Sequence, residues 1–289
     1  GLLSSVCAQY ILDQEVKLKR SAAARRQAVP AQLMVNGCRM TAEDSDKFSL
    51  SRASLMTTLQ EFKVKTKVLM FDLYGTVVDM QGGLTEAIAP YLKAKGWNGR
   101  PDALVTWWRR THFENSMIDA LLHREHTPYR EIGRRALTYT LERAGIAHTQ
   151  DEVQQLVAGI ETLRPFPDVV AALTKLKTRY PLAILSNGDP DMLEKARPHL
   201  GIEFDRIISV AEAGSFKPHV ATYRKAAELL GLAPDAILFV ANHAFDCVGA
   251  KAYGMRTCFV DRRKRPFGQW PYPPDLIVAD FKELAERFA

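Results

Sequence analysis

A carboxylate stands at the end of the first strongly apolar run of the chain. The run KVLMF (67–71) leads directly into Asp72, and Tyr74, Gly75 and Thr76 follow it. A carboxylate at a strand end is commonly a turn or helix cap. An aspartate can also act as a covalent nucleophile, which divides one difficult hydrolysis into two easier steps. Thr76 is placed to donate a hydrogen bond to Asp72 and fix its orientation.

Polar side chains also follow three later apolar runs. They are Ser186-Asn187-Gly188 after LAIL, Lys217-Pro218 in the loop after IISV, and Asn242, His243 and Asp246 after AILFV. In a parallel sheet, such segments meet at the carboxyl edge, where ligands bind. Lys217 would there hold Asp72 ionised and stabilise an oxyanion during ester hydrolysis. Each group alone indicates a turn or a surface residue, but their joint placement favours a catalytic site.

Short apolar runs predict the strands that would hold these groups. They cover residues 67–72, 182–187, 206–210, 236–242, 256–261 and 276–280. Nearly continuous aliphatic runs are typical of parallel strands that are buried on both faces. Amphipathic segments at 168–180, 221–231 and 247–254 predict helices between the strands. This alternation favours an α/β fold with a doubly wound, Rossmann-like parallel sheet.

The domain organisation follows from where this alternation starts and where it is interrupted. Residues 82–165 show helical patterns and no strand, at 84–96, 102–123, 129–145 and 151–163, which predicts an inserted helical cap. Residues 66–81 and 166–289 then form the core. Residues 1–60 are small, polar and charged without steady periodicity, and we expect them to be a poorly ordered or added extension.

Composition limits the partners of the chain. The 289 residues carry a formal charge of +6, but residues 1–65 hold ten Lys/Arg against six Asp/Glu, so the remainder is nearly neutral. The RRKR run at 262–265 is typical of a solvated loop, and we expect no nucleic acid. No apolar run approaches the ~18 residues of a membrane span, and no signal-peptide pattern is present. Cys247 and Cys258 lie in apolar surroundings and predict buried, reduced thiols in a cytoplasmic protein.

Over residues 66–289 the chain resembles the haloacid dehalogenase superfamily, with its motifs and a helical cap between the first two. The segments FDLYGT, WWR, LAILSNGDP, FKPHVATY and LFVANHAFD resemble the L-2-haloacid dehalogenases within it. Phosphatases of the superfamily carry a second aspartate where this chain has Tyr74, and an acidic residue where it has Asn242. Both changes remove anionic oxygens that Mg²⁺ prefers, so we expect no metal and no other cofactor.

The resemblance also implies a role for each matching residue. Asp72 would be the nucleophile, oriented by Thr76, with Lys217 beside it and Asp246 placing the hydrolytic water. Arg109 would receive the halide, and Ser186 and Asn187 would bind the substrate carboxylate. The other expected substrate contacts are Leu73, Tyr74, Tyr223, Asn242, His243 and Phe245. Ala241 and His243 depart from the most familiar pattern of the family, which has serine and asparagine there.

The expected function is therefore hydrolysis of short (S)-2-haloacids and haloacetates to 2-hydroxy acids, through an ester on Asp72. The expected partner is a small halogenated carboxylic acid, and the resemblance implies a homodimer formed through the cap. Three alternatives stay open: a related covalent hydrolase acting on another small carboxylate, a phosphatase, and a non-catalytic binding protein of the same fold. Intact Asp72, Lys217 and Asp246 argue against the last.

Overall fold

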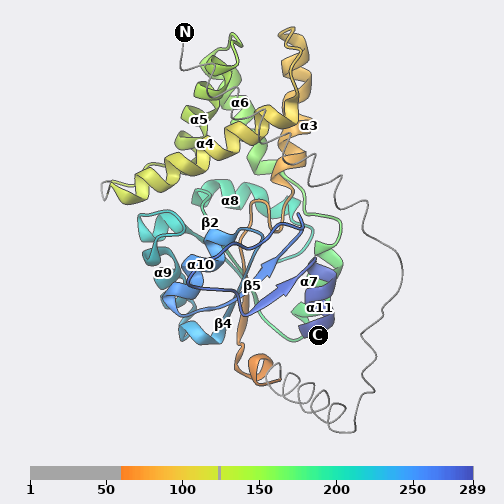
Figure 1. The fold of residues 1–289 in the computed structure, drawn as a ribbon, viewed down its shortest axis with the longest axis vertical. Helices are drawn as coiled ribbons and strands as arrows, with labels where there is room; N and C mark the ends of the chain where they lie inside the picture. The colour runs from red at the N-terminus through yellow and green to blue at the C-terminus, as the bar shows by residue number, and fades with distance from the viewer. Residues whose placement is uncertain (1–59, 123–124, 289) are drawn as a thin grey trace, which may run out of the picture. The chain divides into compact units, whose positions relative to one another are not determined.

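Every predicted strand is present, within three residues at either end, in the computed structural model, which describes residues 60–122 and 125–288 (Figure 1). The predicted extension at 1–60 lies outside the described residues except for Gln60. The strands are β1 Val68–Phe71, β2 Leu182–Ser186, β3 Arg206–Ser209, β4 Ile237–Ala241, β5 Arg256–Val260 and β6 Leu276–Val278. All neighbouring strands are parallel, in the order β3-β2-β1-β4-β5-β6.

This strand order confirms the doubly wound sheet and locates its switch point. From β1 the chain proceeds to β2 and β3 on one side, and then crosses to β4, β5 and β6 on the other. Strands β1, β2 and β4 are buried along their whole length, as their aliphatic sequences predict. The carboxyl ends of β1 and β4 therefore lie side by side where the order reverses, which is where open α/β sheets bind ligands.

Helices pack against the sheet. They are α7 Val169–Lys177, α8 Pro190–Ala196, α9 Val220–Leu230, α10 Ala244–Tyr253 and α11 Phe281–Phe288, with short 3₁₀ turns at Arg197–His199, Val210–Ala213 and Pro234–Ala236. In Figure 1, α9 and α10 lie on one side of the strands, and α7 and α11 on the other. Helix α10 begins three residues earlier than the predicted 247. Asp246 consequently lies in the first turn of a helix, where an acidic side chain is favourable.

The described residues between β1 and α7 form a helical insertion without a strand. Its helices are α3 Met80–Ala94, α4 Pro101–Leu121, α5 Tyr129–Arg143 and α6 Gln150–Ala158, followed by a 3₁₀ turn at Gly159–Thr162. Local signals fix their starts: the Asp79 side chain accepts from Gly82 N at α3, Pro101 opens α4, and Thr149 and Glu152 form a capping box at α6.

Two chain crossings connect the helical insertion to the sheet. At the outgoing crossing Val78 bridges to Pro165, and Asp79 N donates to Arg164 O at 2.9 Å. At the returning crossing Phe166 N donates to Val77 O at 3.0 Å. The two crossings are thus hydrogen-bonded to each other only a few residues after Asp72, so the insertion joins the sheet beside the predicted nucleophile.

Candidate active site

Asp72 is held at the end of β1 by a fixed hydrogen-bond donor. Its side chain is largely buried, and Thr76 Oγ1 donates to Asp72 Oδ2 at 2.6 Å. The same hydroxyl accepts from Asn242 N, at the end of β4, at 2.9 Å. Because Thr76 already accepts there, its single proton is directed at Asp72. Gly75, with φ +89°, makes the tight turn that brings Thr76 back over the carboxylate.

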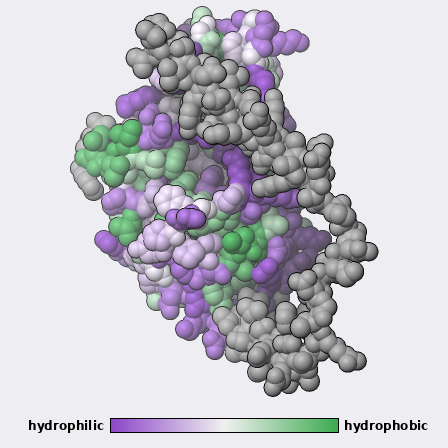
Figure 2. All heavy atoms as spheres, in the orientation of Figure 1, coloured by the Kyte–Doolittle hydropathy of each residue, from purple (hydrophilic) through white to green (hydrophobic). Residues whose placement is uncertain are grey.

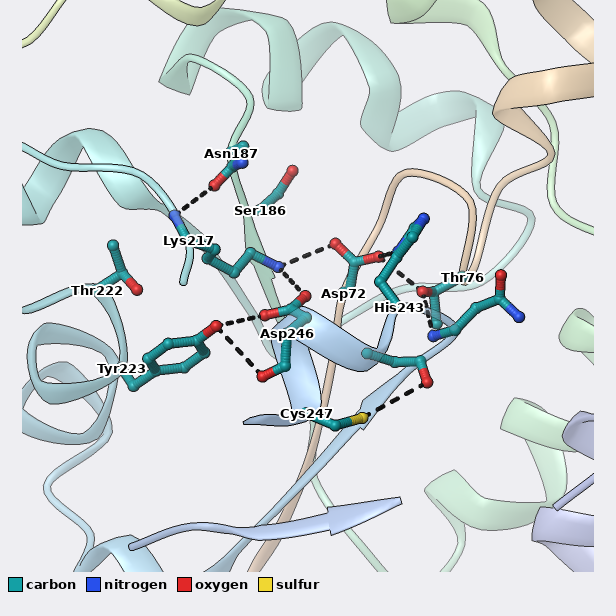
Figure 3. Close-up of polar contacts among 12 residues, drawn as sticks. Asp72, Thr76, Ser186, Asn187, Lys217, Thr222, Tyr223, His243, Asp246 and Cys247 are labelled. Carbon is teal, nitrogen blue, oxygen red and sulfur yellow. Dashed lines mark hydrogen bonds and ion pairs between the residues drawn. The ribbon is translucent and has the colours of Figure 1, made fainter. Parts of the chain in front are cut away.

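Lys217 lies between two carboxylates. Its Nζ is 2.9 Å from Asp72 Oδ1 and 2.8 Å from Asp246 Oδ2, and only 2% of the side chain is exposed (Figure 3). Burial opposes the charge on Lys217, but Asp246 and Asp72 raise the pKa of the ammonium. Burial alone would raise the pKa of the Asp72 carboxyl, yet Lys217, His243 and Thr76 lower it well below its usual value. The predicted nucleophile is therefore ionised at neutral pH.

Asp246 differs electrostatically from Asp72, although both touch Lys217. Tyr223 OH donates to Asp246 Oδ1 at 2.6 Å. Burial raises the pKa of Asp246 despite the stabilising charge of Lys217, and the charge of Asp72 adds to this rise. Two neighbouring carboxyls with pKa values shifted in opposite directions are typical of acid–base pairs. Asp246 is the one that takes up a proton more readily.

The end of β2 and the loop after it supply uncharged donors on the same edge of the sheet. Asn187 Oδ1 accepts from Lys217 N at 3.1 Å, which fixes the side-chain amide and leaves its NH₂ group for another partner (Figure 3). The buried Ser186 hydroxyl accepts from Gly188 N at 3.2 Å and keeps its own proton available. Two donors beside the ionised Asp72 can hold a substrate carboxylate, although their role as its ligands stays a prediction.

His243 and Arg109 both lie beside Gly75, in the turn that follows the nucleophile. His243 Nδ1 lies 3.4 Å from Asp72 Oδ2. A β-carbon at Gly75 would meet His243 Nε2 at 3.3 Å and Arg109 Nη2 at 3.2 Å, so imidazole and guanidinium both lie over this glycine. Arg109 comes from α4 and is fixed by a hydrogen bond from Nη1 to Gln81 Oε1 at 2.9 Å. Burial, with the charge of Arg263, lowers the pKa of Arg109 to about 10, so it is cationic at neutral pH.

Other predicted contacts take different positions. The Asn242 side chain donates to Val260 O at 2.6 Å, so this amide binds β5. Leu73 is 1% exposed and Tyr223 is fully buried, which favours packing and positioning for both. The Phe245 ring packs against Phe113 of α4, tilted by 36° with 4.2 Å between the ring centroids. Direct substrate contact by these residues stays a prediction.

Tyr129 and His112 are aromatic neighbours of the site that the sequence did not indicate. The Tyr129 ring stacks on Tyr74 (5.8 Å, interplanar angle 4°) and on His112 (4.0 Å, 28°). His112 is buried and its Nε2 lies 3.1 Å from Tyr129 O, and burial lowers its pKa to about 4. Both residues sit in amphipathic helical segments, where aromatic residues usually pack in the core, so no local pattern distinguished them.

The RRKR run is only partly the solvated loop that its composition predicts. Residues 263–265 are exposed, but Arg262 is half-buried and binds Asp168 at 2.7 and 2.9 Å from Nη1. The prediction was wrong for Arg262 because a nearby carboxylate and two aromatic rings compensate its charge. Its guanidinium lies 4.2 Å from the Phe166 ring centroid and 5.0 Å from that of Phe281.

Two features elsewhere complete the description. Cavities of about 470 Å³, beside β3 and α8, and about 260 Å³, between α4 and α5, are not lined by Asp72 or its partners. The candidate site is therefore assigned to Asp72 from its contacts with Lys217 and Thr76 and not from a cavity.

Within residues 60–122 and 125–288, no helix is both long and apolar enough to cross a membrane. In the same residues, His, Cys, Asp and Glu form no group of three suited to a metal ion.

Comparison with known proteins agrees with this geometry. The profile of haloacid dehalogenase-like hydrolases matches residues 66–254. The chain is 30% identical to an (S)-2-haloacid dehalogenase of Pseudomonas putida over 221 residues, which are 75% of this chain and 96% of that protein. Its fold superposes with a TM-score of 0.67 on L-2-haloacid dehalogenase from Xanthobacter autotrophicus with chloropropionic acid covalently bound, at 29% identity over 76% of this chain and 97% of that one.

A second solved structure is similar to the same degree. It is a defluorinating L-2-haloacid dehalogenase, which superposes with a TM-score of 0.69 at 30% identity. The superposition covers 77% of this chain and 95% of that one. The two superpositions thus span nearly the whole length of both solved structures.

Proposed function

The chain belongs to the haloacid dehalogenase-like hydrolases, and we propose that it hydrolyses the carbon–halogen bond of short (S)-2-haloacids and haloacetates. The observation that carries this proposal is a buried carboxylate, Asp72, which is kept ionised by Lys217 and Thr76 and has two uncharged donors beside it. An ionised carboxylate with little water around it is a strong nucleophile toward carbon.

In the first step, one oxygen of Asp72 attacks the carbon that bears the halogen. The new carbon–oxygen bond forms as the carbon–halogen bond breaks, and attack from the opposite side inverts the configuration. Ser186 and Asn187 donate hydrogen bonds to the substrate carboxylate, and the Arg109 guanidinium binds the departing halide through its N–H groups. The product is an ester between the substrate and the Asp72 side chain.

In the second step, water attacks the carboxyl carbon of that ester. Asp246, whose pKa is raised, is suited to take the proton of this water, and Lys217 stabilises the oxyanion that forms. The ester collapses to a 2-hydroxy acid and a restored Asp72, which now carries one oxygen from water. The net reaction consumes one water and releases a halide ion and a proton.

This chemistry does not require a metal ion. The place between the two carboxylates, which a divalent cation would need, holds the Lys217 ammonium at 2.9 and 2.8 Å. Tyr74 and Asn242 contribute no anionic oxygen, and the Asn242 amide already binds Val260 O. These contacts favour a dehalogenase over a magnesium-dependent phosphatase, and the convergence of three charged side chains favours an enzyme over a binding protein.

A single-turnover experiment in ¹⁸O-water tests the proposal. With enzyme in excess over (S)-2-chloropropionate, the heavy oxygen should enter the Asp72 side chain, as measured by mass spectrometry of the peptide that contains it. Asp72→Asn, which keeps the shape of the side chain, should lose activity by orders of magnitude. Heavy oxygen found only in the product acid would show direct attack by water and overturn the ester mechanism.

Three finer features belong to the same proposal. The insertion would act as a cap, since Arg109 of α4 reaches the nucleophile. Its outer face carries the exposed side chains Ile118, Leu121 and Leu122 at the end of α4, seen as an apolar patch in Figure 2. This patch supports a homodimer, which sedimentation of wild type and Leu121→Glu would test. The free, buried thiols of Cys247 and Cys258 support a reducing, cytoplasmic setting.

A further inference from the structure

Arg262, the first residue of the basic run, makes contacts that converge on the nucleophile loop. Its Nη1 binds Asp168 Oδ1 at 2.7 Å and Oδ2 at 2.9 Å, and its Nη2 donates to Thr76 O at 3.3 Å. Only 12% of the side chain is exposed. A charged group this far from water is stable because a carboxylate pairs with it and aromatic rings cover it.

The partners of Arg262 belong to both crossings of the helical insertion. Thr76 precedes the outgoing crossing at Val77–Asp79, whereas Phe166 and Asp168 follow the returning one at Arg164–Pro165. The guanidinium stacks 4.2 Å from the Phe166 ring centroid. Asp168 also accepts from Phe281 N, at the start of α11, at 2.8 Å. Arg262 therefore links the outgoing crossing to the returning one and, through Asp168, to the start of α11.

Thr76 is consequently held on three sides. Its hydroxyl donates to Asp72 Oδ2 at 2.6 Å and accepts from Asn242 N at 2.9 Å, while its carbonyl accepts from Arg262. The first two contacts fix the hydroxyl relative to β1 and β4. The third joins the Thr76 carbonyl to a side chain that also binds Asp168 after the returning crossing. It adds to the main-chain bonds from Thr76 N to Leu73 O at 3.4 Å and from Phe166 N to Val77 O at 3.0 Å.

We infer that Arg262 is a positioning residue, which holds Thr76 in register with Asp72. The inference rests on the proposed function, because it assigns Arg262 to the attack step of that reaction. Without the Nη2 contact, Thr76 shifts and the Asp72 carboxylate loses its orienting donor. Misplacement of a reacting group by about 1 Å costs up to ~100-fold in rate.

Arg256 provides a control at the other end of β5. It starts β5, whereas Arg262 follows the end of β5, and it also donates to a main-chain carbonyl, Phe62 O, at 2.8 Å. Its guanidinium also stacks on an aromatic ring, 4.7 Å from the centroid of Phe62. Arg256 thus makes the same kinds of contact at the opposite edge of the sheet, away from Thr76.

The experiment compares Arg262→Lys with Arg256→Lys. Lysine keeps the charge beside Asp168 but has no second nitrogen for Thr76 O, so Arg262→Lys should stay folded. We expect it to lower kcat for halide release roughly 10-fold with KM little changed, since one orienting contact is lost. Arg256→Lys should lower the melting temperature about as much as Arg262→Lys does. Its kcat should stay within twofold of wild type. A kcat of Arg262→Lys within twofold of wild type would overturn the inference.

A double-mutant cycle tests whether Arg262 acts through Thr76. In a Thr76→Ala background the orienting hydroxyl is already gone, so Arg262→Lys should lower kcat by less than twofold further. The same factor in both backgrounds would show that Arg262 acts elsewhere.

Hydrogen exchange of the amides at 76–79 gives a readout without substrate. It should accelerate in Arg262→Lys and not in Arg256→Lys. Should wild type release no halide, the proposed function fails. In that case, exchange at 76–79 that is the same in Arg262→Lys and wild type would overturn the positioning role. Faster exchange in Arg262→Lys would uphold it.

Discussion

The ring of Tyr223 occupies the space in which a side chain at position 249 would begin. A β-carbon on Gly249 would lie 2.7 Å from both Cε2 and the hydroxyl oxygen of Tyr223, and 2.9 Å from Cβ of Pro218. Contacts under 3.0 Å force a displacement. Because Tyr223 OH donates to Asp246 Oδ1, Gly249 determines whether Asp246 keeps its second donor.

We expect Gly249→Ala to impair the reaction as well as the fold. Moving Tyr223 removes a hydrogen bond from Asp246 and overpacks a buried site, which costs about 1–3 kcal/mol in the free energy of unfolding. The rate of ester hydrolysis should fall more than the rate of halide release, as burst kinetics would measure. Gly159→Ala is the control, because its β-carbon would meet only ordinary contacts at 3.8 and 3.9 Å. Equal rates for Gly249→Ala and wild type would contradict this role.

Replacing Lys217 by Met, which removes the ammonium between the carboxylates, should destabilise the fold more at neutral pH than at acidic pH. In wild type the pKa of Asp72 is lowered. The stability this shift provides is therefore present above the unfolded value of about 3.9 and is lost as the pH falls through the folded pKa. Lys217→Met leaves two buried carboxyls unneutralised, at a cost of about 3–5 kcal/mol near neutral pH. Burial and mutual repulsion then raise their pKa values above the unfolded ones, so this penalty shrinks as acid protonates one of them.

Melting temperatures between pH 8 and pH 5 measure this effect. The difference between wild type and Lys217→Met should narrow as the pH falls. Lys251→Met, which removes the partly exposed ion pair with Asp275, should give a small difference that changes little with pH. If the melting-temperature difference between wild type and Lys217→Met does not change with pH, the loss of stability does not come from the charges of Asp72 and Asp246.

Activity should not depend on a divalent cation. Lys217 already neutralises Asp72 and Asp246, so an added Mg²⁺ would have to displace a buried ammonium with distances of 2.9 and 2.8 Å. Halide release should survive exhaustive EDTA treatment, with a magnesium-dependent phosphatase treated alongside as the control. Reactivation by Mg²⁺, together with hydrolysis of p-nitrophenyl phosphate, would instead favour the phosphatase alternative.

The sequence predicted the strands and the catalytic edge because those features are local. An aliphatic run marks a buried strand wherever it packs, and Asp72, Lys217 and Asp246 each follow such a run directly or by a short loop. Contacts between distant segments left no comparable pattern. Tyr129 reaches Tyr74 only through the fold of the insertion. Arg262 has the composition of a surface run and becomes buried because Asp168 and Phe166 happen to return beside it.

Asp189 should control how firmly the insertion is attached. Its carboxylate, in the loop after β2, accepts from Tyr129 N at 2.7 Å and Arg130 N at 3.0 Å, and so caps α5 from the core. Asp189→Ala should cost about 1 kcal/mol in the free energy of unfolding and raise KM, because Tyr129 loosens beside the site. Thr149→Ala removes the cap of α6 in the same insertion and should cost stability without raising KM. The same KM for both variants would separate Asp189 from the site.

His243 should influence the choice of halide. Its Nδ1 lies 3.4 Å from Asp72 Oδ2, and its ring shares the space over Gly75 with Arg109, the predicted halide ligand. His243→Asn removes the imidazole from this space. Fluoride release from fluoroacetate should fall more than bromide release from bromoacetate, because a small, hard leaving group gains most from a donor. His199→Asn, an exposed site, is the control, and a variant at 243 with an unchanged halide order would leave His243 as a packing residue.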